Sequence, residues 1–216
     1  VGVTEARELH SSNIQLGAIA MTVLRGLVGF TFFHLAFWLR SQDQGTLWFA
    51  AVVGVSALAS MFGNAVASLL RERVREETML TAALLVCAGA GLGVAVLGGP
   101  IGAVVLAAVL NLMAALGRLN FESIVQRDAP GANQGRAFAV FETRFQLAWA
   151  GGAFVAVALQ VSGTIGFLIV GSAAVAASIH LFGRRRTGAA VSRRRRGRAR
   201  GPAPRSRSAS AERRDR

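Results

Sequence analysis

The chain of 216 residues has no lysine and only one cysteine. A single cysteine, Cys87, excludes a disulfide within the chain, so cysteine usage indicates no redox compartment. All 24 basic residues are therefore arginine, and together with abundant Ala, Gly and Val this indicates a bacterial genome rich in G and C. The first residue is Val1, and no signal peptide precedes the first apolar stretch. We therefore expect a fragment whose N-terminal part is missing.

Charged residues are absent from three long stretches, 44–70, 78–117 and 145–183. Hydrophobic residues make up 53% of the chain, which is too many for an ordinary soluble domain. Gly98-Gly99-Pro100 and Ser162-Gly163 break the two longer stretches into pieces of about 20 residues, each able to cross about 30 Å of hydrocarbon. Because backbone in lipid must satisfy its own hydrogen bonds, these pieces are predicted to be helices.

The predicted fold is all-α, a polytopic membrane protein with six transmembrane helices. The helices are expected at Leu16–Leu39, Trp48–Leu70, Thr78–Leu97, Ile101–Leu119, Phe138–Gln160 and Thr164–Phe182. Residues 1–15 are interpreted as a cytoplasmic lead-in, residues 16–183 as the helix bundle and residues 184–216 as a disordered, arginine-rich cytoplasmic tail. The glycine-rich run 87–93 lies inside a predicted span, so it favours close helix approach over nucleotide binding.

Arginine is distributed very unevenly along the chain. Of the 24 arginines, 14 lie in 184–216, so the net charge of +13 belongs to the tail and not to a folded surface. The connections between six spans lie alternately on the two sides of the membrane. One side holds Arg7, the second-to-third loop, the fourth-to-fifth loop and the tail, whereas the connections on the other side carry only Arg40. The positive-inside rule then predicts that both termini are cytoplasmic and that the protein lies in the inner (plasma) membrane of a bacterial cell.

The tail arginines are predicted to bind anionic lipid head groups, each contributing about 1 kcal/mol near the surface. The first clusters are Arg184, Arg185, Arg186, Arg193, Arg194, Arg195 and Arg196. Phosphate contacts would also suit nucleic acid. No aromatic residues are interleaved for base stacking, so we expect no nucleic acid partner.

Arg25 lies inside the first predicted span, where an unpaired charge costs between about 2.5 and 17 kcal/mol. It either snorkels to lipid phosphates at the inner interface or faces a cavity, where it holds an anionic substrate or a carboxylate. Glu142 is a candidate partner across the bundle. The stripe of Glu142, Gln146 and Trp149 at helical spacing is typical of a cavity face, whereas the alternative is an acid stabilised by the start of its helix.

Two further polar residues lie within predicted spans. His34 sits in an aromatic run and either couples transport to protons, because its reference pKa is near 6.5, or is a packed, hydrogen-bonded residue. Asn111 lies near the middle of the fourth span and either links helices by a hydrogen bond or contacts a ligand. No catalytic residue, metal site or cofactor is predicted.

An intramembrane protease is the main enzymatic alternative. The stretch Gly54–Ala57 lacks the second glycine of the rhomboid-type G-x-S-G motif. Ser56 and His180 are also expected at opposite ends of their spans, more than about 15 Å apart and beyond hydrogen-bond reach. The sequence therefore argues against an enzyme.

The chain resembles the C-terminal half of a major facilitator superfamily transporter over about 14–186. The resemblance is carried by six helices with both ends inside, by the basic loop "LLRERVREE" and by the loop "QRDAPGANQGRAF". The resemblance implies half of a twelve-helix fold with a central cavity, and a secondary transporter that exports a small molecule. Its partners would be the substrate and the missing N-terminal half or a second copy. The residues matching cytoplasmic gate motifs are Gly63, Arg71, Arg73, Arg75, Pro130, Gly135 and Arg136, although the helix-end aspartate of the first motif is absent.

The alternative function is a non-transporting six-helix membrane protein whose basic tail binds anionic lipid or a cytoplasmic partner. Deleting 184–216 distinguishes the two hypotheses. A tail-based function is lost on deletion, whereas a transporter core keeps its activity.

Overall fold

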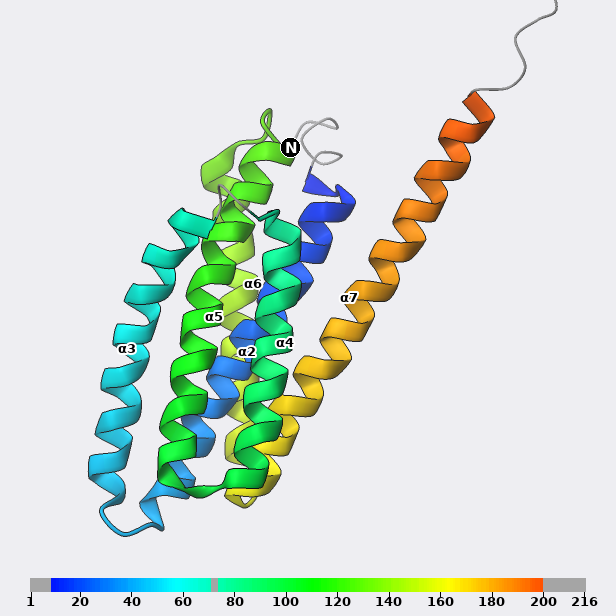
Figure 1. Ribbon diagram of the computed structural model, residues 1–216. Helices are drawn as coiled ribbons and strands as arrows, with labels where there is room; N and C mark the ends of the chain where they lie inside the picture. The colour runs from blue at the N-terminus through cyan, green and yellow to red at the C-terminus, as the bar shows by residue number, and fades with distance from the viewer. Residues whose placement is uncertain (1–8, 71–73, 200–216) are drawn as a thin grey trace, which may run out of the picture. The chain divides into compact units, whose positions relative to one another are not determined.

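Figure 1 shows the computed structural model of the chain, which describes residues 9–70 and 74–199. Within these ranges the chain forms six helices and no strand, which confirms the predicted all-α class. The helices are α2 (Ser12–Arg40), α3 (Gly45–Leu70), α4 (Glu76–Leu97), α5 (Gly99–Asp128), α6 (Gln134–Leu159) and α7 (Gly163–Ala199). The chain divides into two compact units, Val1–Phe182 and Gly183–Arg216, and the bundle described below belongs to the first.

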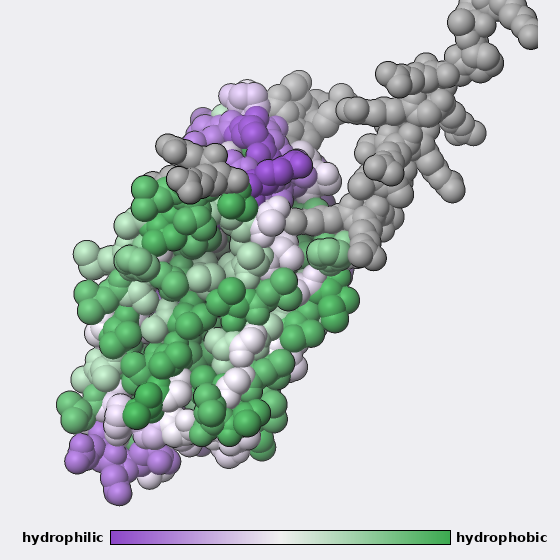
Figure 2. Space-filling view, in the orientation of Figure 1, coloured by the Kyte–Doolittle hydropathy of each residue, from purple (hydrophilic) through white to green (hydrophobic). Residues whose placement is uncertain are grey.

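Five of these helices, α2, α3, α4, α5 and α7, are long and apolar enough to cross a membrane. Within the described residues α6 falls below that standard, because its first half carries Arg136, Glu142 and Arg144 among apolar residues. Figure 2 shows the consequence on one face of the molecule, where apolar residues cover the middle of the bundle and polar residues gather at its two ends. This is the surface of a multi-pass membrane protein.

The helix ends follow from local sequence. Gly98 and Gly99 have φ angles of 68° and 78°, which end α4 and lead into Pro100 in the first turn of α5. The Ser11 hydroxyl accepts a hydrogen bond from the Ile14 amide at 3.4 Å, which caps the start of α2. The Asn133 side chain accepts one from the Arg136 amide in the same way and caps α6.

Several of the predicted helices are shorter than the observed ones. α2 begins at Ser12 and not at Leu16, and α5 continues to Asp128 and not to Leu119. The charged residues of 120–128 predict a loop, whereas a helix can continue through charged residues once it has left the hydrocarbon. Ion pairs described below hold this last part of α5 to the start of α4.

Helix α7 is longer than the predicted span. It continues to Ala199, beyond the expected end at Phe182. Alanine and arginine have high helix propensity, and a helix started in the apolar span extends into such a sequence without a new nucleation step. The interpretation of 184–216 as a disordered tail stays a prediction, and residues 200–216 lie outside the described part.

Helix packing places α2 and α5 at the centre of the first unit. α5 packs on α3, α4 and α2, and α2 packs on α6 as well (Figure 1). Small residues allow the closest approaches: a side chain on Gly63 of α3 would meet the Leu112 carbonyl of α5, and one on Gly91 of α4 would meet the backbone of Gly171 in α7. The interpretation of the glycine-rich run as packing surface thus holds at Gly91.

Candidate functional site

The structure brings Arg25 and Glu142 together. Arg25 lies 13 residues after the start of α2, about 20 Å along the helix axis, and Glu142 projects from the neighbouring α6. The Arg25 Nη2 atom is 3.9 Å from the Glu142 Oε1 atom. Gln146, one turn further along α6, donates a hydrogen bond from its Nε2 atom to the same oxygen at 2.8 Å. Three polar residues predicted to face a cavity therefore form one cluster on two adjacent helices.

Glycines set the spacing of the two helices that carry this cluster. A side chain on Gly29 of α2 would overlap the Trp149 carbonyl of α6, and one on Gly152 of α6 would overlap the Gly26 carbonyl of α2. Because the backbones approach so closely, the side chains next to the contact reach across it. Arg25 directly precedes Gly26, so its guanidinium meets α6 without leaving the bundle.

The ion pair leaves hydrogen-bonding capacity of Arg25 unused. Its 3.9 Å separation is longer than the 2.7–2.9 Å typical of a charge-assisted hydrogen bond. Arg25 Nε is buried and has no hydrogen-bond partner among the described residues. The side chain is 21% exposed and that of Glu142 37% exposed, so both remain within reach of a small ligand.

Trp149 has a packing role in the structure. Its ring meets that of Phe33 on α2 edge to face, with centroids 5.9 Å apart. The ring therefore covers the α2–α6 contact beyond Arg25 along the helix.

His34 lies away from this cluster, nine residues or about 13 Å further along α2. It is buried, stacks on Phe30 at 5.6 Å and meets the edge of Phe167 from α7 at 5.9 Å. Gly166 of α7 is adjacent, and a side chain there would overlap the imidazole ring. The structure thus places His34 in helix packing, and it also lines a cavity of about 440 Å³ that includes Trp38.

Asn111 makes no interhelical hydrogen bond in the described structure. Its Nδ2 atom donates to the Ala107 carbonyl of its own helix at 2.9 Å. Asn120 was missed because the sequence analysis ended the helix at Leu119. This residue is fully buried, its Nδ2 atom donates to the Leu116 carbonyl at 2.8 Å, and its Oδ1 atom has no partner among the described residues.

The gate candidates lie in different surroundings. Gly63 is a buried packing position on α3, and Arg75 is an exposed residue at the start of α4, 3.8 Å from Glu77. Pro130 is exposed in the α5–α6 connection, and Gly135 and Arg136 are exposed in the first turn of α6. Arg71 and Arg73 lie outside the described residues. Of the tail arginines, Arg184 is exposed, and the side chains from Arg185 onward lie outside the described part.

A second polar cluster, not predicted, joins the ends of three helices. Arg127, near the end of α5, contacts Glu76 at 2.7 Å, Glu77 at 2.6 Å and the adjacent Asp128 at 2.8 Å. Asn13 of α2 donates a hydrogen bond to Asp128 at 2.9 Å. The acidic pair at the start of α4 could have indicated this cluster. A helix start favours acidic residues, and an arginine at the end of the next helix can form ion pairs with them.

Comparison with known proteins gives one match. A family model described as Major Facilitator Superfamily matches residues 2–153, which contain α2 to α5 and most of α6, including both polar clusters. No curated protein and no solved structure matches the chain. Since the family match covers most of its length, the chain belongs to the major facilitator superfamily of membrane transporters.

Proposed function

We propose that this chain is the C-terminal, six-helix half of a transporter that exports a small amphipathic molecule. The other half of the pathway would come from an N-terminal six-helix half or from a second copy of this chain. The proposed arrangement has both termini in the cytoplasm of a bacterial cell, with the bundle in the inner membrane. The arginine distribution supports this orientation.

The observation that carries the proposal is the cluster of Arg25, Glu142 and Gln146. A charge pair within a helical membrane bundle is expensive to bury, and such residues commonly mark a substrate or ion pathway. The cluster lies on two helices of one six-helix half, so it would move as a unit when that half rocks against the other half of a transporter.

Within this proposal Arg25 is the substrate-contacting residue. Its ion pair is long and its guanidinium donors are not saturated, so an acceptor group of the substrate can bind beside Glu142. His34 and Asn111 are then peripheral to the site, because the first packs against α7 and the second bonds to its own helix.

The test is export by cells that express the chain. Efflux of a panel of fluorescent amphipathic compounds is measured in cells carrying the parent protein, Arg25→Gln, Glu142→Gln and the control Arg40→Gln, which alters an exposed arginine at the end of α2. The proposal predicts lower accumulation of at least one compound with the parent and the control, and none of that protection with the first two variants at equal protein levels. Protection that persists in both site variants would contradict the assigned role.

A further inference from the structure

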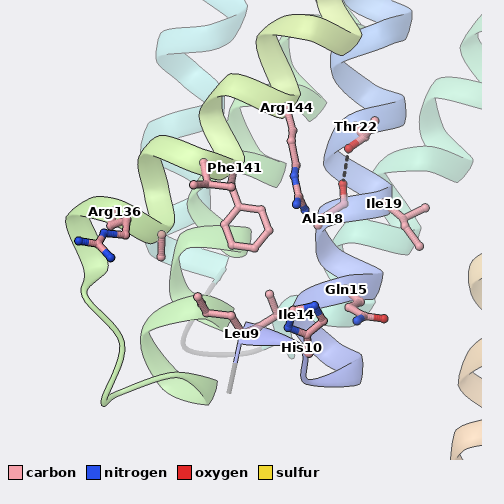
Figure 3. Close-up of a pocket in the computed structure, with 12 residues that line it drawn as sticks. Leu9, His10, Ile14, Gln15, Ala18, Ile19, Thr22, Arg136, Phe141 and Arg144 are labelled. Carbon is pink, nitrogen blue, oxygen red and sulfur yellow. Dashed lines mark hydrogen bonds between the residues drawn. The ribbon is translucent and has the colours of Figure 1, made fainter. Parts of the chain in front are cut away.

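A cavity of about 480 Å³ separates α2 from α6 at the end of the bundle where both helices begin (Figure 3). It lies apart from the Arg25 cluster, since neither Arg25 nor Glu142 lines it. One part of its wall is apolar and comes from both helices. This part includes Ile14, Ala18 and Ile19 of α2 and Val140 and Phe141 of α6.

Two arginines of α6, Arg136 and Arg144, line the cavity together with His10. No Asp or Glu among the residues that the structure describes lines it. Neither arginine forms an ion pair within the described residues, whereas Arg118 and Arg127 of α5 both pair with carboxylates. Within the described part of the chain, the two arginines therefore give the cavity wall positive charge that no carboxylate pairs with.

The two arginines are arranged along the cavity. They are eight residues apart on α6, about 12 Å along the axis. Figure 3 shows the Arg144 side chain directed back along α6, toward the end where Arg136 and His10 lie. Its guanidinium carbon is 5.8 Å from the centroid of the Phe141 ring, which supports it over the apolar wall. Positive charge is thus directed toward the helix starts, with apolar surface beneath it.

We propose that this cavity binds an anionic phospholipid from the leaflet at which α2 and α6 begin. The Arg144 guanidinium contacts the phosphate, for which its planar fork is suited, Arg136 adds positive charge at the cavity wall, and an acyl chain lies on the apolar wall. Basic pockets between transmembrane helices bind head groups in this way. The site is distinct from the arginine-rich tail, because it is built from residues of the first compact unit.

The test uses the full chain in phosphatidylcholine vesicles that contain a small fraction of phosphatidylglycerol with a photoactivatable acyl chain. After illumination, labelled peptides are mapped by mass spectrometry. Labelling is expected within 9–22 and 136–144, and phosphatidylcholine carrying the same photoactivatable chain should label these peptides much less. Because each label is mapped to a peptide, lipid at the tail is counted separately.

The double variant Arg136→Gln/Arg144→Gln should reduce pocket labelling roughly tenfold, the effect of about 1.4 kcal/mol of lost binding. The matched control is Arg40→Gln/Arg118→Gln, which removes the same charge from exposed arginines outside the cavity and should leave labelling unchanged. If the double variant does not fold, Ala18→Phe retains both arginines, fills the cavity and should also abolish labelling.

Three results would overturn the proposal. Equal labelling by both lipids would mean that the cavity does not recognise charge. Labelling that survives both the arginine variant and Ala18→Phe would place the lipid elsewhere. Loss of labelling on addition of soluble glycerol phosphate would identify a soluble phosphate compound, and not a lipid, as the occupant.

Discussion

Two arginines of this protein meet carboxylates in very different ways. Arg127, at the end of α5, contacts three carboxylates within 2.8 Å, whereas Arg25, midway along α2, has one carboxylate at 3.9 Å. Multiple short contacts at a helix end fix a structure, and here each of the three guanidinium nitrogens donates to a carboxylate. The long, single contact inside the bundle leaves room for exchange of partners. The contacts of the first residue therefore indicate a role in stability, and those of the second suit the role in transport proposed above.

Arg127→Gln should lower the thermal unfolding midpoint in detergent by about 2–4 °C, the effect of about 1 kcal/mol lost from a partly exposed network. The glutamine cannot contact Glu76 and Glu77 together, so the link between α5 and α4 is lost. The matched control is Arg118→Gln, which removes one exposed pair with Glu122 on the same helix. Equal shifts in the two variants would show that the network adds nothing to a single surface pair.

The sequence predicted the individual polar residues of the candidate site better than their roles. Arg25 and Glu142 stood out because charges are rare in apolar spans, and their pairing was a hypothesis that the structure supports by proximity. Roles that depend on helix rotation were not readable. The packing of His34 against Phe167 depends on the position of α7, which no local pattern encodes.

At the scale of helices, the contact between α2 and α6 depends on glycine. Gly152 faces α2 at backbone distance, whereas the adjacent Gly151 has no atom within 4 Å of the position that a side chain would take. Substituting each of these two glycines by alanine therefore distinguishes the effect of helix propensity from the effect of helix packing.

Gly152→Ala should destabilise the protein by about 1–3 kcal/mol, because the added carbon forces α2 and α6 apart. Gly151→Ala should be neutral or stabilising by up to about 1 kcal/mol, since alanine is the better helix former and nothing opposes it. Thermal unfolding of both variants in the same detergent measures the difference. A destabilised Gly151→Ala beside an unaffected Gly152→Ala would contradict the described packing.

The charge-free runs predicted which segments form helices but not where the helices end. The four spans at 48–70, 78–97, 101–119 and 164–182 all lie within observed helices because lipid excludes unpaired backbone. Beyond the hydrocarbon that constraint is absent, and charged segments follow tertiary contacts instead. Asn120 and Arg127 lie in this part of α5, and the ion pairs of Arg127 with Glu76 and Glu77 hold it to the start of α4.

At the scale of the whole molecule, arginine asymmetry predicts which ends of the helices face the cytoplasm. Cys87 is the one cysteine of the chain and is buried, so added cysteines report their own accessibility. Ser41 and Asn133 are exposed in connections at opposite ends of the bundle.

In intact cells a membrane-impermeant maleimide should label Ser41→Cys directly, because the α2–α3 connection is expected outside. Asn133→Cys should react only after permeabilisation, because the α5–α6 connection is expected in the cytoplasm. Labelling in the reverse order would mean that the bundle is inserted the other way round. The proposed lipid leaflet and export direction would then both be wrong.

The central claim is that the Arg25–Glu142 pair forms part of a transport pathway, and the most direct test of it is a charge swap. Export of a fluorescent compound handled by the parent protein is compared in Arg25→Glu, Glu142→Arg and the double variant, with membrane levels matched. Each single change leaves two like charges facing each other and should abolish export. The double variant restores opposite charges at the same place and should recover a substantial part of it. Full export in either single variant, or no recovery in the double variant despite normal folding, would contradict the claim.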